Sequence, residues 1–290
     1  MLVYFNFQYS DSIPGGYQLL RYDDINEISD GRLYSENDMV RVDTNGCEGC
    51  SKCCESDMGN SIVLDPYDIF HMTEGAGKTF DELLVSFLVE LDMIDNIVLP
   101  HIKMDNGCGF LNADKRCSIH KYRPSICRLF PLGRLYNDKG FDYILQTGEC
   151  IKDNCSKIKV DKWLGIEDLS RHSAFINKWH RFLQFERKKV REIIERAENE
   201  AMRISSISEE ALTVYAGIIG DSEILDEKGI DKYRIEKCAA FREEAQEGSK
   251  AVMKTVLRIF YMEEYKHSED FFTQFDERLK KCLSELRRIN

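Results

Sequence analysis

The run Cys47-Glu-Gly-Cys50-Ser-Lys-Cys53-Cys54 gathers four thiols in one short stretch of the chain. Two residues between cysteines let both sulfurs turn toward one ion or cluster, as in zinc knuckles and iron–sulfur sites. Adjacent side chains on an extended backbone point to opposite sides. We therefore expect Cys53 and Cys54 to direct their sulfurs to two different sites. The run predicts a metal-binding domain around it.

A second group of cysteines lies further along the chain. It reads Gly107-Cys108-Gly109-Phe-Leu, then Cys117-Ser-Ile-His120-Lys-Tyr-Arg123-Pro124-Ser-Ile-Cys127-Arg128-Leu-Phe-Pro131, with Cys150 and Cys155 after it. Glycines beside a cysteine let the backbone approach a metal site closely. Pro124 restricts Arg123 to extended geometry and can start the turn that carries Cys127. The guanidinium groups of Arg123 and Arg128 could offset the negative charge of a thiolate site.

The candidate metal ligands are the nine clustered cysteines. They are Cys47, Cys50, Cys53, Cys54, Cys108, Cys117, Cys127, Cys150 and Cys155. Their density and spacing argue against buried free thiols, although cysteine is a common core residue. A metal that only stabilises the fold remains an open alternative. Cys238 and Cys282 fall on apolar helical stripes, so we expect them to be buried core thiols.

The complete pattern resembles the YkgJ-type cysteine-cluster family, whose members are described as zinc- or iron-chelating proteins. The resemblance covers about residues 47–150, and the segment from Cys117 to Pro131 is its most distinctive part. It implies eight motif cysteines, namely all of the nine candidates except Cys155. Cys155 and His120 are then extra or substitute ligands. A distant branch with a similar motif includes flagellin lysine N-methylases, which implies a chemistry based on S-adenosylmethionine.

The composition limits which binding partners and which cellular compartment are expected. The net charge of −11 argues against nucleic acid, which needs a basic face to displace counterions. The most apolar run, Leu83 to Leu91, is too short to span a bilayer. The N-terminus lacks the cationic start of an export signal. We therefore expect a cytoplasmic protein with no membrane partner. In a reducing compartment the eleven cysteines are metal ligands or free thiols sooner than disulfides.

The distribution of prolines and apolar residues predicts a mainly helical α+β fold. We expect a loop-rich metal-binding domain with a few short strands over residues 1–160, and an α-helical bundle over 161–290. No proline follows Pro131, and apolar residues then recur at helical spacing. The expected helices cover about 171–204, 208–219, 231–246, 248–265 and 269–288. Earlier in the chain, strands are expected at 61–64 and 141–146, and a helix is expected to begin at Asp65-Pro66. The pair Thr79 and Glu82 has capping-box spacing, which predicts a helix with its apolar face running to Leu91.

Two functions from different classes fit these features. The first is a protein whose iron–sulfur clusters, of the [4Fe–4S] type, or zinc ions serve a redox or a protein- or peptide-modifying reaction. Its substrate could dock on the helical region. The second is a non-enzymatic zinc or iron carrier, a sensor, or a zinc-stabilised interaction module. Eight or nine cysteines suit two sites of four ligands, and iron–sulfur clusters and zinc share this spacing.

Overall fold

The computed structural model describes residues 2–4, 25–42, 50–57, 61–104, 107–148, 150, 156–219 and 227–289. The fold is α+β and mainly helical, with short antiparallel strands before a long helical region, as predicted. The chain divides into two compact units. Unit 1 comprises Met1–Leu183 and Leu257–Lys281, and unit 2 comprises Gln184–Val256 and Cys282–Asn290.

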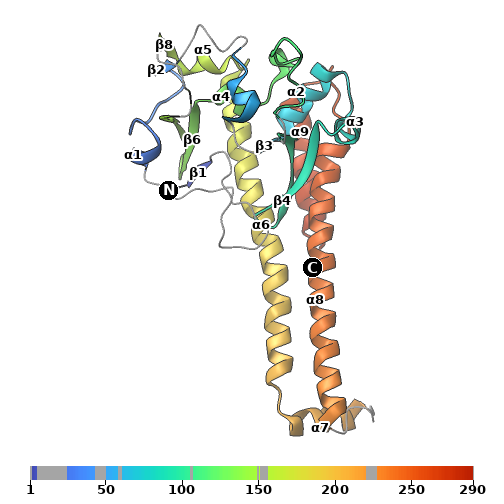
Figure 1. The fold of residues 1–290 in the computed structure, drawn as a ribbon. Helices are drawn as coiled ribbons and strands as arrows, with labels where there is room; N and C mark the ends of the chain where they lie inside the picture. The colour runs from blue at the N-terminus through green and yellow to red at the C-terminus, as the bar shows by residue number, and fades with distance from the viewer. Residues whose placement is uncertain are drawn as a thin grey trace. The chain divides into compact units, whose positions relative to one another are not determined.

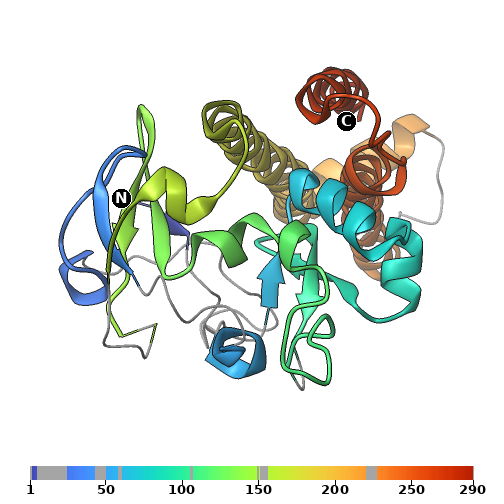
Figure 2. The ribbon, with the colours of Figure 1, turned by 90° about the horizontal axis from the view of Figure 1, so that it is seen from above.

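Unit 1 contains three small antiparallel sheets. The first has the order β1 (Leu2–Tyr4), β6 (Leu132–Asn137), β7 (Gly140–Leu145), and the second pairs β2 (Met39–Val42) with β8 (Ser156–Lys159). The third has the order β3 (Ser61–Val63), β5 (Ile97–Lys103), β4 (Val89–Ile94). The predicted strands at 61–64 and 141–146 correspond to β3 and β7. The short helix α4 (Ser125–Leu129) lies between the first and third sheets (Figures 1 and 2).

Other short helical segments lie in the described, loop-rich part of unit 1. They are α1 (Ile25–Ile28), α2 (Pro66–Ala76), α3 (Phe80–Val85), the 3-10 turn His120–Tyr122 and α5 (Val160–Leu164). α2 begins at the predicted residue, with Pro66 in its first turn, where a missing N–H is harmless. Capping boxes close the starts of both α2 and α3, the second between Thr79 and Glu82 as predicted.

The predicted helical face from Phe80 to Leu91 is wrong beyond Val85. α3 ends there, and Val89–Ile94 forms β4, which pairs with β5. Phe87 has a left-handed φ of 54° and is 72% exposed, so it terminates the helix instead of extending its buried face. Asp95 and Asn96, both at positive φ, then close a two-residue hairpin. A short apolar run fits a strand as well as a helix, and pairing with β5 decides between them.

The start of α6 (Leu169–Ser206) belongs to unit 1 and packs through aromatic side chains. The Phe175 ring lies 4.7 Å from that of Phe275 and 5.2 Å from that of Phe271, in edge-to-face contacts. Tyr261, in the π-helical turn Arg258–Met262, donates its hydroxyl to the Leu64 carbonyl at 3.2 Å. These contacts bring residues 257–281 to the sheet region, so the compact units divide the chain differently from a boundary at residue 160.

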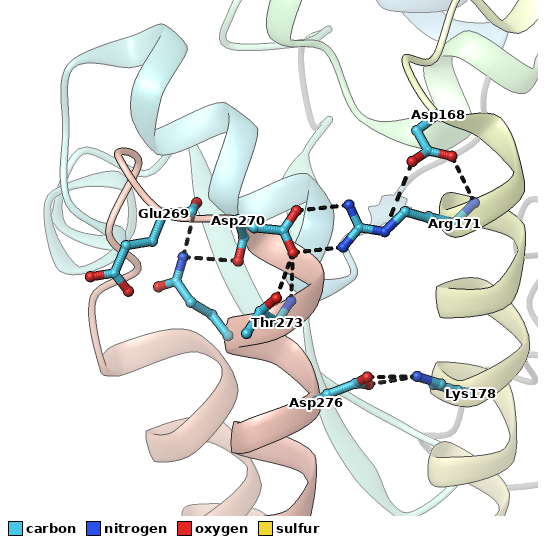
Figure 3. A network of polar contacts seen from close by, with 8 residues as sticks. Asp168, Arg171, Lys178, Glu269, Asp270, Thr273 and Asp276 are labelled. Atoms are coloured by element: carbon cyan, nitrogen blue, oxygen red, sulfur yellow. Dashed lines mark hydrogen bonds and ion pairs between the residues drawn. The ribbon is translucent and has the colours of Figure 1, made fainter.

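Ion pairs join α6 to α9 (Phe271–Leu286) within unit 1 (Figure 3). Arg171 donates to both oxygens of Asp270, at 3.0 and 2.7 Å, and Lys178 Nζ lies 2.7 Å from Asp276 Oδ1. Asp270 also accepts from the backbone N–H and the hydroxyl of Thr273, at the start of α9. The hydrogen bonds from the Arg171 guanidinium lower the pKa of Asp270 to about 2. The pairs are about half exposed, so solvent screens them.

Replacing Arg171 with alanine should therefore lower the stability of unit 1 only slightly at neutral pH. The pKa of Asp270 is depressed in the folded state. The contribution of the pair is thus present above its unfolded pKa, near 4, and is lost as the pH falls toward 2. Urea unfolding of Arg171→Ala, Asp270→Asn and the double variant at pH 7 and pH 4 measures the coupling. A coupling that grows as the pH falls from 7 to 4 would contradict this assignment.

Unit 2 is helical. The second half of α6 and most of α8 (Glu227–Leu257) run antiparallel, with α7 (Glu209–Ile219) between them in the chain (Figure 1). The long helix predicted over 171–204 is confirmed by α6. The two helices predicted over 231–246 and 248–265 are instead one helix, α8, followed by the π-helical turn. A lone glycine such as Gly248 weakens a helix by only about 1 kcal/mol, which packing overrides. In the described part of the chain, no helix combines the length and apolar composition needed to cross a membrane.

Candidate metal centre

The first cysteine run forms a tight turn in place of an extended strand. Ser51 has a φ of 55°, and its carbonyl accepts the N–H groups of Cys54 and Glu55, both at 2.9 Å. A π-helical turn then covers Cys53–Asp57. The thiols of Cys53 and Cys54 hydrogen-bond to each other. The premise that these adjacent sulfurs point to opposite sides is therefore wrong, because the backbone coils here, and both sulfurs can serve the same site.

The loop that carries Cys108 is docked on this turn. Its N–H donates to the Cys54 carbonyl at 2.7 Å. Gly107 adopts a φ of 90°, and a Cβ there would lie 3.3 Å from the same carbonyl oxygen, so this position needs glycine. At the far side of the loop, Lys115 Nζ lies 2.8 Å from Glu55 Oε1. A bridge between Leu111 and Cys117 closes the loop. Cys108 and Cys117 are thereby held next to the first run.

Cys127 enters the site on α4. Pro124 precedes this helix, and its carbonyl accepts the N–H of Arg128 at 3.1 Å. The Arg128 guanidinium is directed back along the chain, where Nε donates to the Arg123 carbonyl at 3.3 Å and Nη2 donates to that of Lys121. Arg128 thus braces the turn before the helix. Cys127 itself is half-buried.

Five thiols from these three segments act on one another electrostatically. Burial raises the pKa of Cys108, Cys117 and Cys127, and the neighbouring thiolates raise each of them further. The pKa of Cys54 is also raised. The largest cause is the hydrogen bond with Cys53, followed by burial and by the charges of Cys108 and Cys127. At Cys117 the positive charge of Arg123 acts in the opposite direction and lowers the thiol pKa. A bound cation would favour the thiolates, so metal binding at this cluster should release protons.

The remaining candidate ligands lie outside this group of five thiols. Cys50 and Cys150 are half-buried. Cys47 and Cys155 lie outside the described residues. The His120 ring lies against Arg123, with Nδ1 3.1 Å from Nη1. Within the described ranges, no three His, Cys, Asp or Glu side chains are arranged to hold a metal ion. The five thiols are thus close enough to affect one another's charge, but they do not converge on a single point.

Asp68 and Ser125 are residues of this region that the sequence reading did not single out. Asp68 lies on α2, and its Oδ1 accepts the N–H of Ser125, the first residue of α4, at 2.6 Å. Both residues are buried. The only local signal is the capping position of Asp68 relative to Asp65. Nothing in the spacing of the sequence links Asp68 to Ser125.

The two cysteines of unit 2 differ from each other. Cys282 is fully buried, which confirms the predicted core thiol. Cys238 is half-buried instead of buried, and its thiol donates to the Ala201 carbonyl at 3.5 Å. Both lie in unit 2, whereas the clustered thiols lie in unit 1.

We expect Cys238 and Cys282 to be dispensable for metal binding. Cys282→Ala should leave the metal content unchanged and lower the stability by about 1–2 kcal/mol, because it removes buried sulfur. Cys238→Ala should have a smaller effect, since its side chain is partly exposed. Metal analysis and thermal unfolding of both variants test this. The loss of one metal equivalent from either variant would assign that cysteine to the metal site.

Comparison with known proteins gives one match. Residues 46–156 match the family model CxxCxxCC, which is described as a "putative zinc- or iron-chelating domain". The match spans the described turn, loop and α4, and it includes all nine candidate cysteines. No curated protein and no solved structure matches the chain.

Proposed function

Because residues 46–156 carry a zinc- or iron-chelating domain of the CxxCxxCC family, we propose that the chain is an iron–sulfur protein with clusters of the [4Fe–4S] type. One observation carries the proposal. The backbone ties the loop that carries Cys108 and Cys117 to the Cys53–Cys54 turn, and the thiols of these segments and of Cys127 raise one another's pKa. A donor set made of thiols suits iron–sulfur clusters, which are held by four cysteines each.

The ligands would come from both parts of the motif. Cys53 and Cys54 on the π-helical turn, Cys108 and Cys117 on the docked loop, and Cys127 on α4 would supply five thiolates. Three of the four further candidates, Cys47, Cys50, Cys150 and Cys155, would complete two sites of four ligands each. When bound, such a cluster supplies one-electron chemistry, or a Lewis-acidic iron if one position stays open. The guanidinium of Arg123, which acts on Cys117, would offset part of the thiolate charge.

As an enzyme, the protein would carry out a redox reaction or modify a protein or peptide. In the methyl-transfer version, a substrate amine would take the methyl group of S-adenosylmethionine as its S–CH3 bond breaks, S-adenosylhomocysteine would leave, and the amine would lose a proton. The helices of unit 2 support a docking role, because they expose large apolar side chains, among them Met202, Val214, Ile218 and Ile235. The chain has a net charge of −11, so the proposed partner is a protein or peptide and not a nucleic acid or a membrane. Thiolate chemistry of this kind suits the cytoplasm.

A zinc-stabilised module or metal carrier is the second candidate. Backbone hydrogen bonds between the cysteine-bearing segments favour it. The Cys108 N–H, for example, donates to the Cys54 carbonyl. A structural ion would add to that link, and zinc alone can contribute about 10–16 kcal/mol of apparent folding energy.

Reconstitution of the apo-protein separates these functions. Under anaerobic conditions, iron and sulfide should form clusters with broad absorption at about 400 nm, and added zinc should not displace these clusters. Titration of the reconstituted protein with S-adenosylmethionine, followed by paramagnetic resonance, then tests methyl transfer. A changed spectrum would support that version, and an unchanged spectrum with no heat of binding would remove it. Failure to form clusters, together with stoichiometric zinc binding, would favour the module or carrier.

A further inference from the structure

The helix that carries Cys127 is too short to hold itself in place. α4 has five residues, and isolated helices of this length are unstable in water. Its N-cap position is Pro124, which provides no side-chain hydrogen bond to the first turn. The direction of the Cys127 sulfur must therefore be set by contacts from outside the helix.

A buried carboxylate provides one of these contacts. Asp68 Oδ1 accepts the Ser125 N–H at 2.6 Å, although the two residues are 57 positions apart in the chain. Asp68 Oδ2 accepts the N–H of Asp65 at 3.2 Å, so the same carboxylate also closes the start of α2. The exposed fractions of Asp68 and Ser125 are 3% and 2%. In this dry setting the loss of a hydrogen-bond partner leaves a buried polar group unsatisfied, which is expensive.

A buried histidine holds the same serine from the other side. The Ser125 hydroxyl hydrogen-bonds to the Asp68 carboxylate, and its oxygen lies 3.1 Å from His172 Nε2. Because the hydroxyl has one proton and gives it to Asp68, it accepts from His172, whose Nε2 then carries a proton. His172 is 1% exposed, and its ring packs edge-to-face against Tyr67 at 4.7 Å. Residues of α2, α4 and α6 therefore meet at Ser125, two positions before Cys127.

We propose that Asp68, Ser125 and His172 position Cys127 for metal binding by fixing the start of α4. The inference rests on the proposed metal site, and it adds residues that do not touch the metal. Partners that orient a ligand from behind contribute about 10–100-fold to metal affinity. We expect that range here, because loss of the Asp68 contact leaves α4 without a cap and lets Cys127 leave its position.

Cobalt(II) binding to the full chain provides the test, because thiolate-to-cobalt absorption reports the number of bound thiolates. Asp68→Ala should weaken binding by at least about 10-fold and remove the absorption of about one thiolate. Asp68→Asn keeps an oxygen that can accept the Ser125 N–H. This variant should therefore retain most of the cobalt affinity and most of the thiolate-to-cobalt absorption. Asp65→Ala is the matched control, because Asp65 shares the capping box of α2 but is not a hydrogen-bond partner of Ser125 among the described contacts. It should leave the cobalt spectrum unchanged.

A second pair of variants keeps the test decisive if Asp68→Ala fails to fold. Ser125→Pro removes the N–H that Asp68 accepts, at a first helical position where proline is tolerated, whereas Ser125→Ala removes only the hydroxyl. The proline variant should lose the absorption of one thiolate, and the alanine variant should lose less affinity. Equal cobalt spectra in wild type, Asp68→Ala and Ser125→Pro, or equal losses in Asp65→Ala and Asp68→Ala, would overturn the positioning role. If wild type itself bound no cobalt, the positioning role would be overturned for a single bound ion, whereas the proposed clusters would still be judged by reconstitution with iron and sulfide.

Discussion

Cys127→Ser should lose bound metal and unfold much of residues 40–160, while the helices of the C-terminal region keep most of their helicity. The cysteine-bearing turn, loop and α4 are short segments with few regular elements, and a metal held between them would supply much of their folding energy, on the order of 10 kcal/mol. Cys50→Ser should act in the same direction. Metal analysis, thermal unfolding and far-ultraviolet circular dichroism on the same samples measure the three parts of this result.

The other two cysteines provide the controls for this prediction. Cys238→Ala and Cys282→Ala remove a thiol from unit 2 and should keep the full metal content. A Cys127→Ser protein with wild-type metal content and melting temperature would show that Cys127 is not a ligand.

Glu186→Leu should stabilise the helices of unit 2 at pH 8 by several kcal/mol. Glu186 is fully buried on α6, and neither carboxylate oxygen has a hydrogen-bond partner among the described residues. Burial raises its pKa from 4.5 to about 8, against the opposing charge of Arg187. The difference corresponds to on the order of 3–5 kcal/mol, which leucine would recover because it has no charge to desolvate.

The pH dependence gives this effect a definite sign. Between about pH 4.5 and pH 8 the unfolded chain has released the Glu186 proton while the folded chain retains it, so stability falls as the pH rises. In wild type, urea unfolding should show this decline, and in Glu186→Leu it should be absent. Glu195→Leu changes an exposed residue of the same helix and should alter the stability by less than about 0.5 kcal/mol. Destabilisation by Glu186→Leu at pH 8 would mean that the carboxylate has a partner.

Local patterns in the sequence predicted the features that depend on neighbouring residues. The apolar period of α6, the start of α2 at Asp65-Pro66 and the capping box of α3 depend on residues close together in the sequence, and the structure has them where expected. Features that depend on distant partners were not predictable. β4 follows from pairing with β5, and the continuity of α8 through Gly248 follows from packing that outweighs a weak helix former.

The same division holds at the candidate site. Cysteine spacing singled out the first run as a candidate metal site, because its two-residue gaps are a local pattern typical of metal binding. It did not predict the coil at Cys53-Cys54, which depends on the left-handed backbone of Ser51. Nor could it predict the hydrogen bond from Ser125 to Asp68, since residues 57 positions apart leave no shared pattern.

The metal content of the native protein distinguishes an iron–sulfur protein from a zinc protein. The protein should be purified without exposure to air, and its iron, acid-labile sulfide and zinc should be measured together with its absorption spectrum. An iron–sulfur protein should contain about four iron and four sulfide per occupied cluster, with broad absorption at about 400 nm. Stoichiometric zinc with no sulfide and no visible absorption would contradict the iron–sulfur function and leave a zinc-stabilised domain.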